Sequence, residues 1–208
     1  MRIRKIPTYG MASNCYLLCG SESAAVIDPS AKLEYITDAL SEENVKLTHI
    51  LLTHGHFDHT KNLQLLRELT GAKVCIHRED NEMLGDSVKN CFSLFNEGEQ
   101  TAPPADILLE DGDTVELDGK SVRVIHTPGH SKGSCCFAVG DVIFTGDTLL
   151  YRSIGRYDFY GSSDTALTES LKKLISLPGN YTLYPGHGEK TDLDSERKYN
   201  PYLKDIMS

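Results

Sequence analysis

Residues 53–59 constrain this chain more than any other part of its sequence. They read Thr-His-Gly-His-Phe-Asp-His and directly follow an apolar run at residues 50–52, which is typical of a buried strand. Residues 60–69 then show the polar–apolar pattern of a helix. Histidine is the commonest metal ligand, and three imidazoles with a carboxylate are too dense for an ordinary surface turn. The segment therefore predicts a ligand site where a strand ends, as α/β proteins place them.

Composition limits what kind of protein this is. The chain has 208 residues, of which 39% are hydrophobic and 25% charged, so we expect one soluble globular domain over residues 1–208. A net charge of −9 argues against nucleic acid as a partner. We find no apolar run of membrane-spanning length and no apolar stretch of a signal peptide behind the basic N-terminus, which we read as an edge strand. These features predict a cytoplasmic protein without a membrane partner; they leave its oligomeric state open.

The six cysteines show neither a Cys-x-x-Cys motif nor the spacing of a disulfide-rich domain. We expect free, buried thiols in a reducing compartment. Cys135 and Cys136 are adjacent, so in a strand they would point to opposite faces.

The order of expected elements predicts the fold class. Strand-like runs lie at residues 14–19, 24–27, 49–53, 73–77, 121–126, 134–139, 142–145 and 181–184. Helical patterns lie at residues 32–42, 60–69, 78–84 and 164–176, the last with Asp164 as its N-cap. This order favours an α/β fold: a four-layer αβ/βα sandwich of two mixed sheets with helices outside.

Three further segments share the design of residues 53–59, because each is an apolar strand that ends in a glycine-bearing turn with a metal-competent residue. They are residues 124–130, 142–147 and 183–188. Together the four segments supply seven candidate metal ligands: His54, His56, Asp58, His59, His130, Asp147 and His187. Seven are too many for one tetrahedral zinc, and they suit two ions bridged by a carboxylate and a hydroxide.

Spacing divides some of these ligands between the two ions. His54 and His56 are two residues apart and project to the same side of an extended backbone, so they can hold one ion. Asp58 and His59 lie past a turn and can reach the second. Among the other histidines, we expect His49 at the surface and His77 in capping or packing. His126 is either a residue that orients a metal ligand or a satisfied core histidine.

The irregular stretch at residues 90–106 has two interpretations. It carries Phe92, Leu94 and Phe95, followed by a Pro-Pro pair. It is either a loop that pins itself with a small apolar cluster, or a flap whose aromatic side chains form one wall of a substrate cleft.

The full ligand set resembles the signature of the metallo-β-lactamase superfamily. Residues 127–131, 145–149 and 184–188 are most similar to the glyoxalase II, or hydroxyacylglutathione hydrolase, branch, and the stretch at residues 153–159 is similar to its short bacterial members. The resemblance implies an αβ/βα sandwich with two metals at one rim between the sheets. It also implies that His54, His56 and His130 hold one metal, that Asp58, His59 and His187 hold the other, and that Asp147 bridges them.

The same resemblance implies an activity. A hydroxide bridging two divalent cations would attack a thioester of the hydroxyacylglutathione type, with Asp58 as proton acceptor. We expect zinc, and iron or manganese would also suit these ligands. Glyoxalase II has an additional C-terminal domain, for which this chain shows no sequence, and a Gly-Lys pair where this chain has Gly155-Arg156. We expect Arg156 and Tyr157 to contact a small anionic thioester substrate.

Six cationic residues lie around the expected site and would steer such a substrate: Lys132, Arg152, Arg156, Lys190, Arg197 and Lys198. We expect at least half of them to be ordinary surface residues. Two rival activities stay open. Persulfide dioxygenases, which use one iron, share a similar Gly-Arg-x-Asp-Phe segment, here residues 155–159. Lactone hydrolysis is the third possibility.

Overall fold

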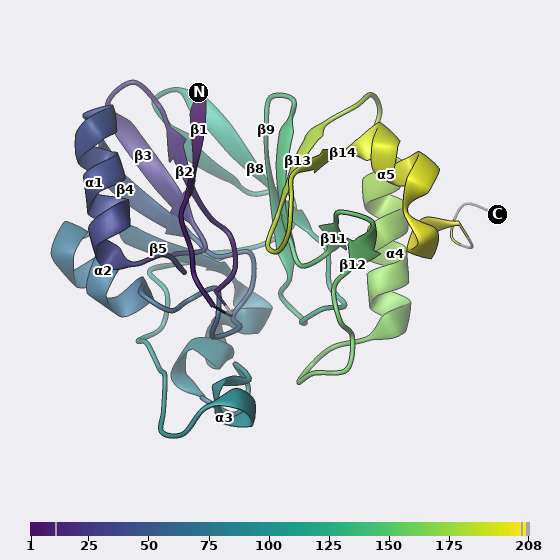
Figure 1. The fold of residues 1–208 in the computed structure, drawn as a ribbon, viewed down its shortest axis with the longest axis horizontal. Helices are drawn as coiled ribbons and strands as arrows, with labels where there is room; N and C mark the ends of the chain where they lie inside the picture. The colour runs from purple at the N-terminus through teal and green to yellow at the C-terminus, as the bar shows by residue number, and fades with distance from the viewer. Residues whose placement is uncertain (11, 205, 207–208) are drawn as a thin grey trace.

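The structure of the protein, a computed structural model, describes residues 1–10, 12–204 and 206. It confirms the expected architecture of two mixed sheets with helices on their outer faces (Figure 1). None of the helices in the described ranges is both long and apolar enough to cross a bilayer.

The first sheet contains six strands in the order β1-β2-β3-β4-β5-β6. Strands β1 to β3 are antiparallel, whereas β3 to β6 are parallel. β1 lies at the edge, as expected for the N-terminal segment. The strands are β1 (Arg2–Ile6), β2 (Cys15–Cys19), β3 (Ser23–Ile27), β4 (Lys46–Leu51), β5 (Lys73–His77) and β6 (Ile107–Leu109).

The second sheet also contains six strands, in the order β14-β13-β10-β9-β8-β7. Within this sheet β10 and β13 pair in parallel, and the other neighbouring strands are antiparallel. The strands are β7 (Thr114–Leu117), β8 (Lys120–His126), β9 (Cys135–Val139), β10 (Val142–Gly146), β13 (Thr182–Pro185) and β14 (Thr191–Asp192), and a separate small hairpin pairs β11 (Leu149–Leu150) with β12 (Ser153–Ile154).

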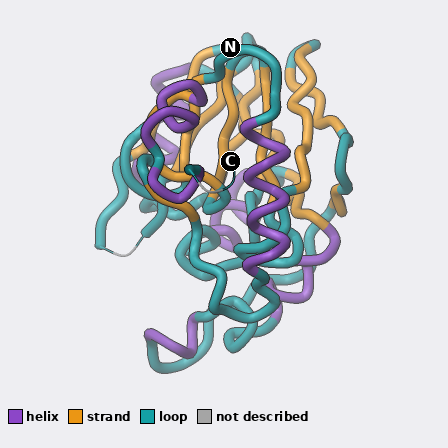
Figure 2. The backbone as a smooth tube through the Cα atoms, turned by 90° about the vertical axis from the view of Figure 1, so that its right-hand side faces the viewer, coloured by secondary structure: helices purple, strands orange, loops and turns teal. Residues whose placement is uncertain are grey.

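Helices cover the outer face of each sheet. α1 (Leu33–Glu43) and α2 (Leu63–Thr70) pack on the first sheet, and α4 (Asp164–Ile175) and α5 (Leu193–Tyr199) on the second. Figure 2, seen from the side of α4 and α5, shows these helices lying over the strands. The described residues also form the short helix α3 (Phe92–Phe95) and the 3₁₀ helices η1 (Arg78–Gly85) and η2 (Pro201–Leu203).

Three apolar layers hold the sandwich together, and neighbouring strand residues alternate between them. Leu17 faces α1 and α2, whereas Leu18 faces the other sheet. Cys135 lies between the sheets and Cys136 beneath the outer helices, which confirms the expected opposite faces. All six cysteines are buried free thiols. Because many strands are covered on both faces, they appear in the sequence as continuous apolar runs.

Some expected boundaries differ from the structure. Ser163, not Asp164, is the N-cap of α4, because the Ser163 hydroxyl accepts a hydrogen bond from the Ala166 amide and Asp164 already has helical geometry. α2 begins only at Leu63, since residues 60–62 belong to the turns that follow the histidine-rich loop. Residues 78–85 form a 3₁₀ helix rather than an α-helix. β6, β7, β14 and α5 were not expected, because each is short.

Candidate metal centre

Four loops meet at one rim of the sandwich, between the two sheets. They follow β4, β8, β10 and β13 and carry all seven expected ligands. Backbone hydrogen bonds join them: the Cys135 amide donates to the Thr53 carbonyl (2.8 Å), and the Gly186 amide donates to the Gly146 carbonyl (2.7 Å). His54 and His187, which are 133 residues apart in the chain, are thus brought into one site by the packing of the two sheets.

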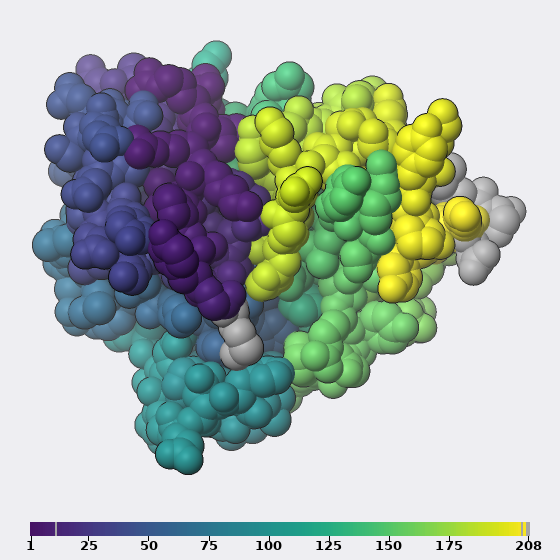
Figure 3. Space-filling view, in the orientation of Figure 1, coloured from purple at the N-terminus to yellow at the C-terminus, as the bar shows by residue number. Residues whose placement is uncertain are grey.

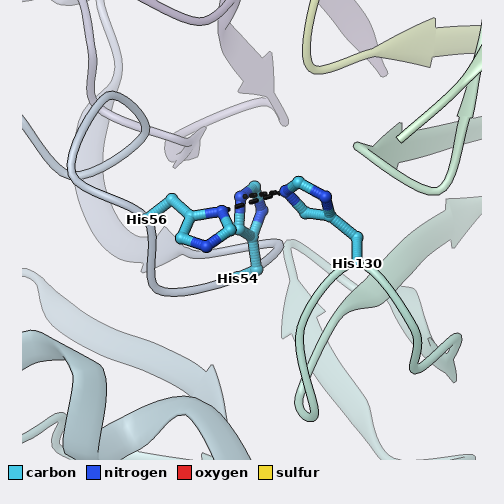
Figure 4. A group of neighbouring side chains, drawn as sticks. All are labelled: His54, His56 and His130. Atoms are coloured by element: carbon cyan, nitrogen blue, oxygen red, sulfur yellow. Dashed lines mark hydrogen bonds between the residues drawn. The ribbon is translucent and has the colours of Figure 1, made fainter. Parts of the chain in front are cut away.

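Three buried imidazoles form the first cluster, which consists of His54, His56 and His130. Nδ1 of His56 lies 2.9 Å from Nε2 of His130, and Nε2 of His54 lies 3.2 Å from the same atom. Figure 4 shows the rings pointing toward one another, two from the loop after β4 and one from the loop after β8. Three nitrogens converging on one point are a suitable set of ligands for a divalent ion.

The second cluster consists of Asp58, His59 and His187. Nε2 of His187 lies 3.1 Å from Oδ2 of Asp58, and Nε2 of His59 lies 3.8 Å from the same oxygen. His59 is fully buried, whereas the His187 side chain is partly exposed. One ion could therefore be held from inside by His59 and from the solvent side by His187.

Asp147 lies between the two clusters. Its Oδ2 is 3.6 Å from Nε2 of His130 in the first cluster, and its Oδ1 is 3.6 Å from Nε2 of His59 in the second. The structure thus brings the expected bridging carboxylate within reach of both sets.

Three buried polar atoms of the site's ligands lack a protein partner, which tests whether a metal would suit it. Among the described residues, Nε2 of His56, Nε2 of His59 and Oδ1 of Asp147 are buried and accept or donate no hydrogen bond. Buried polar atoms are nearly always satisfied, and the atoms of His59 and Asp147 face each other across the site, so they require a group that the side chains do not supply. Nitrogen and carboxylate donors facing each other are what a divalent cation satisfies.

The electrostatics of the site also favour cations. Burial, assisted by the neighbouring imidazoles, lowers the pKa of His54 and His56 well below the ordinary histidine value and keeps these rings neutral. Burial would raise the pKa of Asp58, but His59 and His187 outweigh it and hold that pKa low. Burial opposes protonation of His59, yet the carboxylates of Asp58, Asp28 and Asp147 raise its pKa to about 10. Neutral imidazoles and ionised carboxylates are the forms that ligate metals, so His54, His56 and Asp58 are already in the ligating form. His59 holds a proton among three carboxylates, and an ion bound there would replace that proton.

Asp28 supports the second cluster and was missed by the sequence interpretation. Its Oδ2 accepts a hydrogen bond from Nδ1 of His59 (2.8 Å), and its Oδ1 accepts one from the Thr53 amide (2.8 Å). This contact leaves Nε2 of His59 facing the cluster. A signal was present, because Asp28 follows the apolar run of β3 just as the recognised ligands follow their strands.

Asp80 is a second supporting carboxylate, and it joins the two loops that supply the first cluster. It is fully buried in η1 and accepts hydrogen bonds from the Gly55 amide (3.1 Å), the Ser131 hydroxyl (2.6 Å) and the Gly133 amide (2.6 Å). Burial raises its pKa despite these hydrogen bonds. No local pattern distinguishes Asp80 from the surrounding charged residues of η1.

Two glycines allow the loops to approach Asp147 closely. A Cβ at Gly186 would lie 2.2 Å from Oδ1 of Asp147, and a Cβ at Gly155 would lie 1.7 Å from its carbonyl oxygen. Any side chain at either position would displace the bridging carboxylate or its backbone.

Of the two expected substrate contacts, Arg156 lies at the cavity and Tyr157 does not. Arg156 lines the cavity in front of the clusters, and its carbonyl oxygen accepts a hydrogen bond from Nδ1 of His130 (2.7 Å). Its guanidinium is bound by both carboxylate oxygens of Asp158, at 2.9 Å each. Tyr157 is exposed and is not among the described residues that line the cavity.

Of the other cations that sequence analysis grouped around the site, two have structural roles. Arg152 pairs with the buried Glu196, and Arg197 donates to backbone carbonyls at the end of α4 and beyond, at Ile175 and Gly179. Lys132 lies over the ring of Tyr160, and neither Lys190 nor Lys198 is among the described lining residues of the cavity. Only Arg156 of this group lines it.

The stretch at residues 90–106 lies beside the site. Phe95 of α3 and Cys91 line the cavity, while Phe92 packs on Phe57 with ring centroids 5.7 Å apart. Figure 3 shows the teal segment, which includes α3 of Figure 1, projecting from the lower edge of the molecule beneath the purple and blue half. The segment therefore combines the two interpretations, because one phenylalanine pins it and another forms part of the cavity wall.

The remaining histidines lie outside both clusters. His77 caps η1 by accepting from the Glu79 amide (3.4 Å), as expected. His126 stacks on His77 with centroids 3.8 Å apart, and its Nε2 contacts the Lys132 carbonyl (2.9 Å). Its partner Lys132 lies in the loop that carries His130, but none of the hydrogen bonds of the described residues joins the His126 side chain to a metal ligand. His126 is also only half-buried, so it neither orients a ligand nor belongs to the core, and both interpretations of it were wrong. His49 is half-buried in β4 rather than at the surface, since β5 pairs beside it.

Curated relatives match the chain along almost its whole length. "Probable metallo-hydrolase YqgX" of Bacillus subtilis is 33% identical, and the match covers 98% of both chains. "Hydroxyacylglutathione hydrolase GloC" of Haemophilus influenzae is 32% identical, again with 98% of both chains covered.

Solved structures show the same fold. BLEG-1, described as a B3 metallo-beta-lactamase, has a TM-score of 0.92 at 33% identity, with 98% of this chain and 100% of that chain covered. TTHA1623, solved in a di-iron-bound form, has a TM-score of 0.84 at 34% identity, covering 95% and 99%. ETHE1 from Myxococcus xanthus has a TM-score of 0.78 at 30% identity, covering 97% and 84%.

The sequence model of the metallo-beta-lactamase superfamily matches residues 8–187, a range that includes every residue of both clusters and Asp147. The chain belongs to the metallo-beta-lactamase superfamily.

Proposed function

We propose that this protein is a metal-dependent hydrolase that cleaves thioesters of the hydroxyacylglutathione type. The observation that carries the proposal is the position of Asp147 between two clusters of metal-competent side chains, 3.6 Å from a histidine of each. A single-ion site would not need a shared carboxylate. We propose zinc as the resident ion in both positions.

Each group of side chains would hold one ion. His54, His56 and His130 would bind the first, Asp58, His59 and His187 the second, and Asp147 both. Two divalent cations so placed would lower the pKa of water and polarise the carbonyl of a substrate. Asp28 and Asp80 hold the loops that present these ligands.

The protein's own residues suit attack by water rather than by a side chain. The Ser131 and Ser134 hydroxyls lie 2.6 Å apart, and Ser131 donates to Asp80, so both are engaged. Burial raises the pKa of Cys91, the thiol that lines the cavity, and keeps it protonated. Asp58 remains ionised at the edge of the cavity and can accept the proton that the attacking water loses.

The substrate class is supported by a relative and by Arg156. The chain covers 98% of GloC, so its length is that of a protein named hydroxyacylglutathione hydrolase. Arg156 is the cation at the cavity that could meet a carboxylate of glutathione. We therefore propose a small anionic thioester as the partner of this site.

A second candidate is persulfide oxidation at one iron. It is favoured by the similarity to ETHE1 and by residues 155–159, of which Gly155, Arg156 and Phe159 line the cavity. Lactone hydrolysis would use the same metal ligands. Because the chain is similar to BLEG-1, β-lactams are also included among the substrates to be tested.

Metal analysis combined with parallel assays tests the proposal. The purified protein is expected to contain two equivalents of metal and to hydrolyse S-lactoylglutathione, and Asp147→Asn is expected to reduce both. The exposed Asp38→Asn is the matched control and should change neither. One equivalent of iron, with oxygen uptake on glutathione persulfide and no thioester hydrolysis, contradicts the proposal; faster turnover of a lactone or a β-lactam redirects it.

A further inference from the structure

The walls of the cavity are apolar beyond the metal ligands. The cavity has a volume of about 470 Å³. Phe57, Phe95 and Phe159 line it and form what we term the aromatic wall, and Leu150 and Ile154 of the β11–β12 hairpin add aliphatic surface. Among the described lining residues that are not metal ligands, Arg156 alone carries a charge.

The aromatic wall starts at a metal ligand and is held in place by its own contacts. The ring of Phe159 packs edge-on against the His56 imidazole, with centroids 5.5 Å apart. Phe95 lies 6.3 Å from Phe159 and 6.0 Å from Phe57, and Phe57 is buried against Phe92. These separations are those of interacting aromatic pairs. An apolar group beside the reacting carbonyl would therefore contact the wall directly.

Two features make this wall suitable for an apolar ligand rather than a charged one. Phe95 is 48% exposed and lines the cavity, so contact with an apolar group there would remove part of its surface from water. The Arg156 guanidinium lies over the ring of Phe159 and directs Nε and Nη2 to Asp158. A charged group placed deep against the phenylalanines would find no free partner among the described lining residues outside the metal clusters.

From this geometry we infer that the acyl group of the substrate is large and apolar, and that an aromatic ring at the carbon next to the thioester carbonyl suits the cavity best. The inference rests on the proposed function, because it takes a thioester as the reacting group. The acyl arm is assigned to the wall because the glutathionyl arm carries charges that the phenylalanines cannot satisfy. The glutathionyl arm would extend out of the mouth of the cavity, where the Arg156 side chain is exposed.

A matched pair of substrates tests the inference. S-lactoylglutathione and S-mandeloylglutathione of the same configuration differ only in a methyl or a phenyl group at that carbon. We expect kcat/KM to be about tenfold or more higher for the phenyl substrate, as for added apolar groups in a hydrophobic pocket. Phe95→Ala should reduce this ratio by roughly three- to tenfold, and Phe95→Leu should restore part of it.

The same helix offers a control. Leu94 is 62% exposed and does not line the cavity, so Leu94→Ala should keep the wild-type ratio. A wild-type ratio of one or less, or equal losses in Phe95→Ala and Leu94→Ala, overturns the inference.

A binding arm separates this inference from the proposed function. If the metal-loaded protein hydrolyses neither thioester, the proposed function fails, and calorimetric titration with free mandelate and free lactate then tests the wall alone. Mandelate is expected to bind more tightly to the wild type and to lose that advantage in Phe95→Ala. Equal binding of the two acids by the wild type overturns the inference as well.

Discussion

The Asp28 carboxylate accepts a hydrogen bond from Nδ1 of His59 over 2.8 Å in the buried interior of the rim. The two residues lie on loops that follow neighbouring parallel strands, β3 and β4. This contact fixes the face of the His59 ring that is offered to the second cluster.

We expect Asp28→Ala to weaken metal binding at the second cluster by about 10- to 100-fold, because loss of such an orienting partner frees the imidazole to rotate. Metal content after dialysis against a graded chelator measures the effect. Asp28 reaches the first cluster only indirectly, through the Thr53 hydroxyl, which donates to Asp28 (2.7 Å) and lies 3.1 Å from Nδ1 of His54, so the first ion should be lost at a higher chelator concentration than the second. Asp38→Asn, on the exposed side of α1, is the control; equal metal loss in both variants would refute the role of Asp28.

Gly155→Ala tests the close approach to the bridging residue. The new Cβ would lie 1.7 Å from the Asp147 carbonyl oxygen, so the backbone must move. We expect a loss of about 1–3 kcal/mol in unfolding free energy, as for other overpacked sites, together with reduced metal content. Gly85→Ala is matched, because its Cβ meets no atom within 4 Å, and it should leave both unchanged. Denaturant unfolding and metal analysis check the pair, and a Gly155→Ala variant with wild-type metal content would contradict the expectation.

Arg156 and Asp158 should have opposite effects on anionic substrates. Arg156→Ala removes the cavity's exposed cation and should raise KM by roughly three- to tenfold, more than it lowers kcat. Asp158→Asn releases the guanidinium from its bidentate partner and should lower KM, by at most about fivefold because the pair is exposed. Steady-state kinetics with an anionic thioester measures both changes, and an unchanged KM in Arg156→Ala would remove Arg156 from the site.

Asp118 should make stability depend on pH in the acid range. In the β7–β8 turn it accepts hydrogen bonds from the Glu22 and Ser23 amides (2.8 and 2.9 Å) and from the Ser23 hydroxyl (2.7 Å), which join the two sheets. These hydrogen bonds hold its pKa well below the usual range. A pKa lowered on folding stabilises the protein above the unfolded value of about 3.9. That stabilisation is lost as the pH falls through the folded pKa.

Thermal unfolding of the wild type and Asp118→Asn between about pH 6 and pH 3 tests this linkage. The wild type should have the higher Tm near pH 6, and the difference should narrow as the solution becomes acid. Asp38→Asn should follow the wild type throughout. If the difference in Tm between the wild type and Asp118→Asn stays constant with pH, the charge of Asp118 does not contribute to stability.

Much of the fold was accessible from local patterns. Strands covered on both faces, such as β2 and β5, appear as short apolar runs, and most of the expected strands lie within a few residues of those in the structure. Short elements such as β6 and β14 gave no periodic signal and are formed only through pairing with their neighbours. The ligand segments were visible because each combines an apolar run, a glycine turn and a metal-competent side chain.

Local patterns along the chain are enough to identify the residue types that can hold two ions and the α/β order of the elements that carry them, since both depend on sequence neighbours. Tertiary packing places Asp147 between the clusters, brings Asp28 to His59 and binds the Arg156 guanidinium to Asp158. It also places Phe95 beside the metal ligands as part of a wall. Periodicity reports which face of a strand or helix is buried, whereas these contacts join loops from different sheets, whose meeting depends on how the two sheets pack.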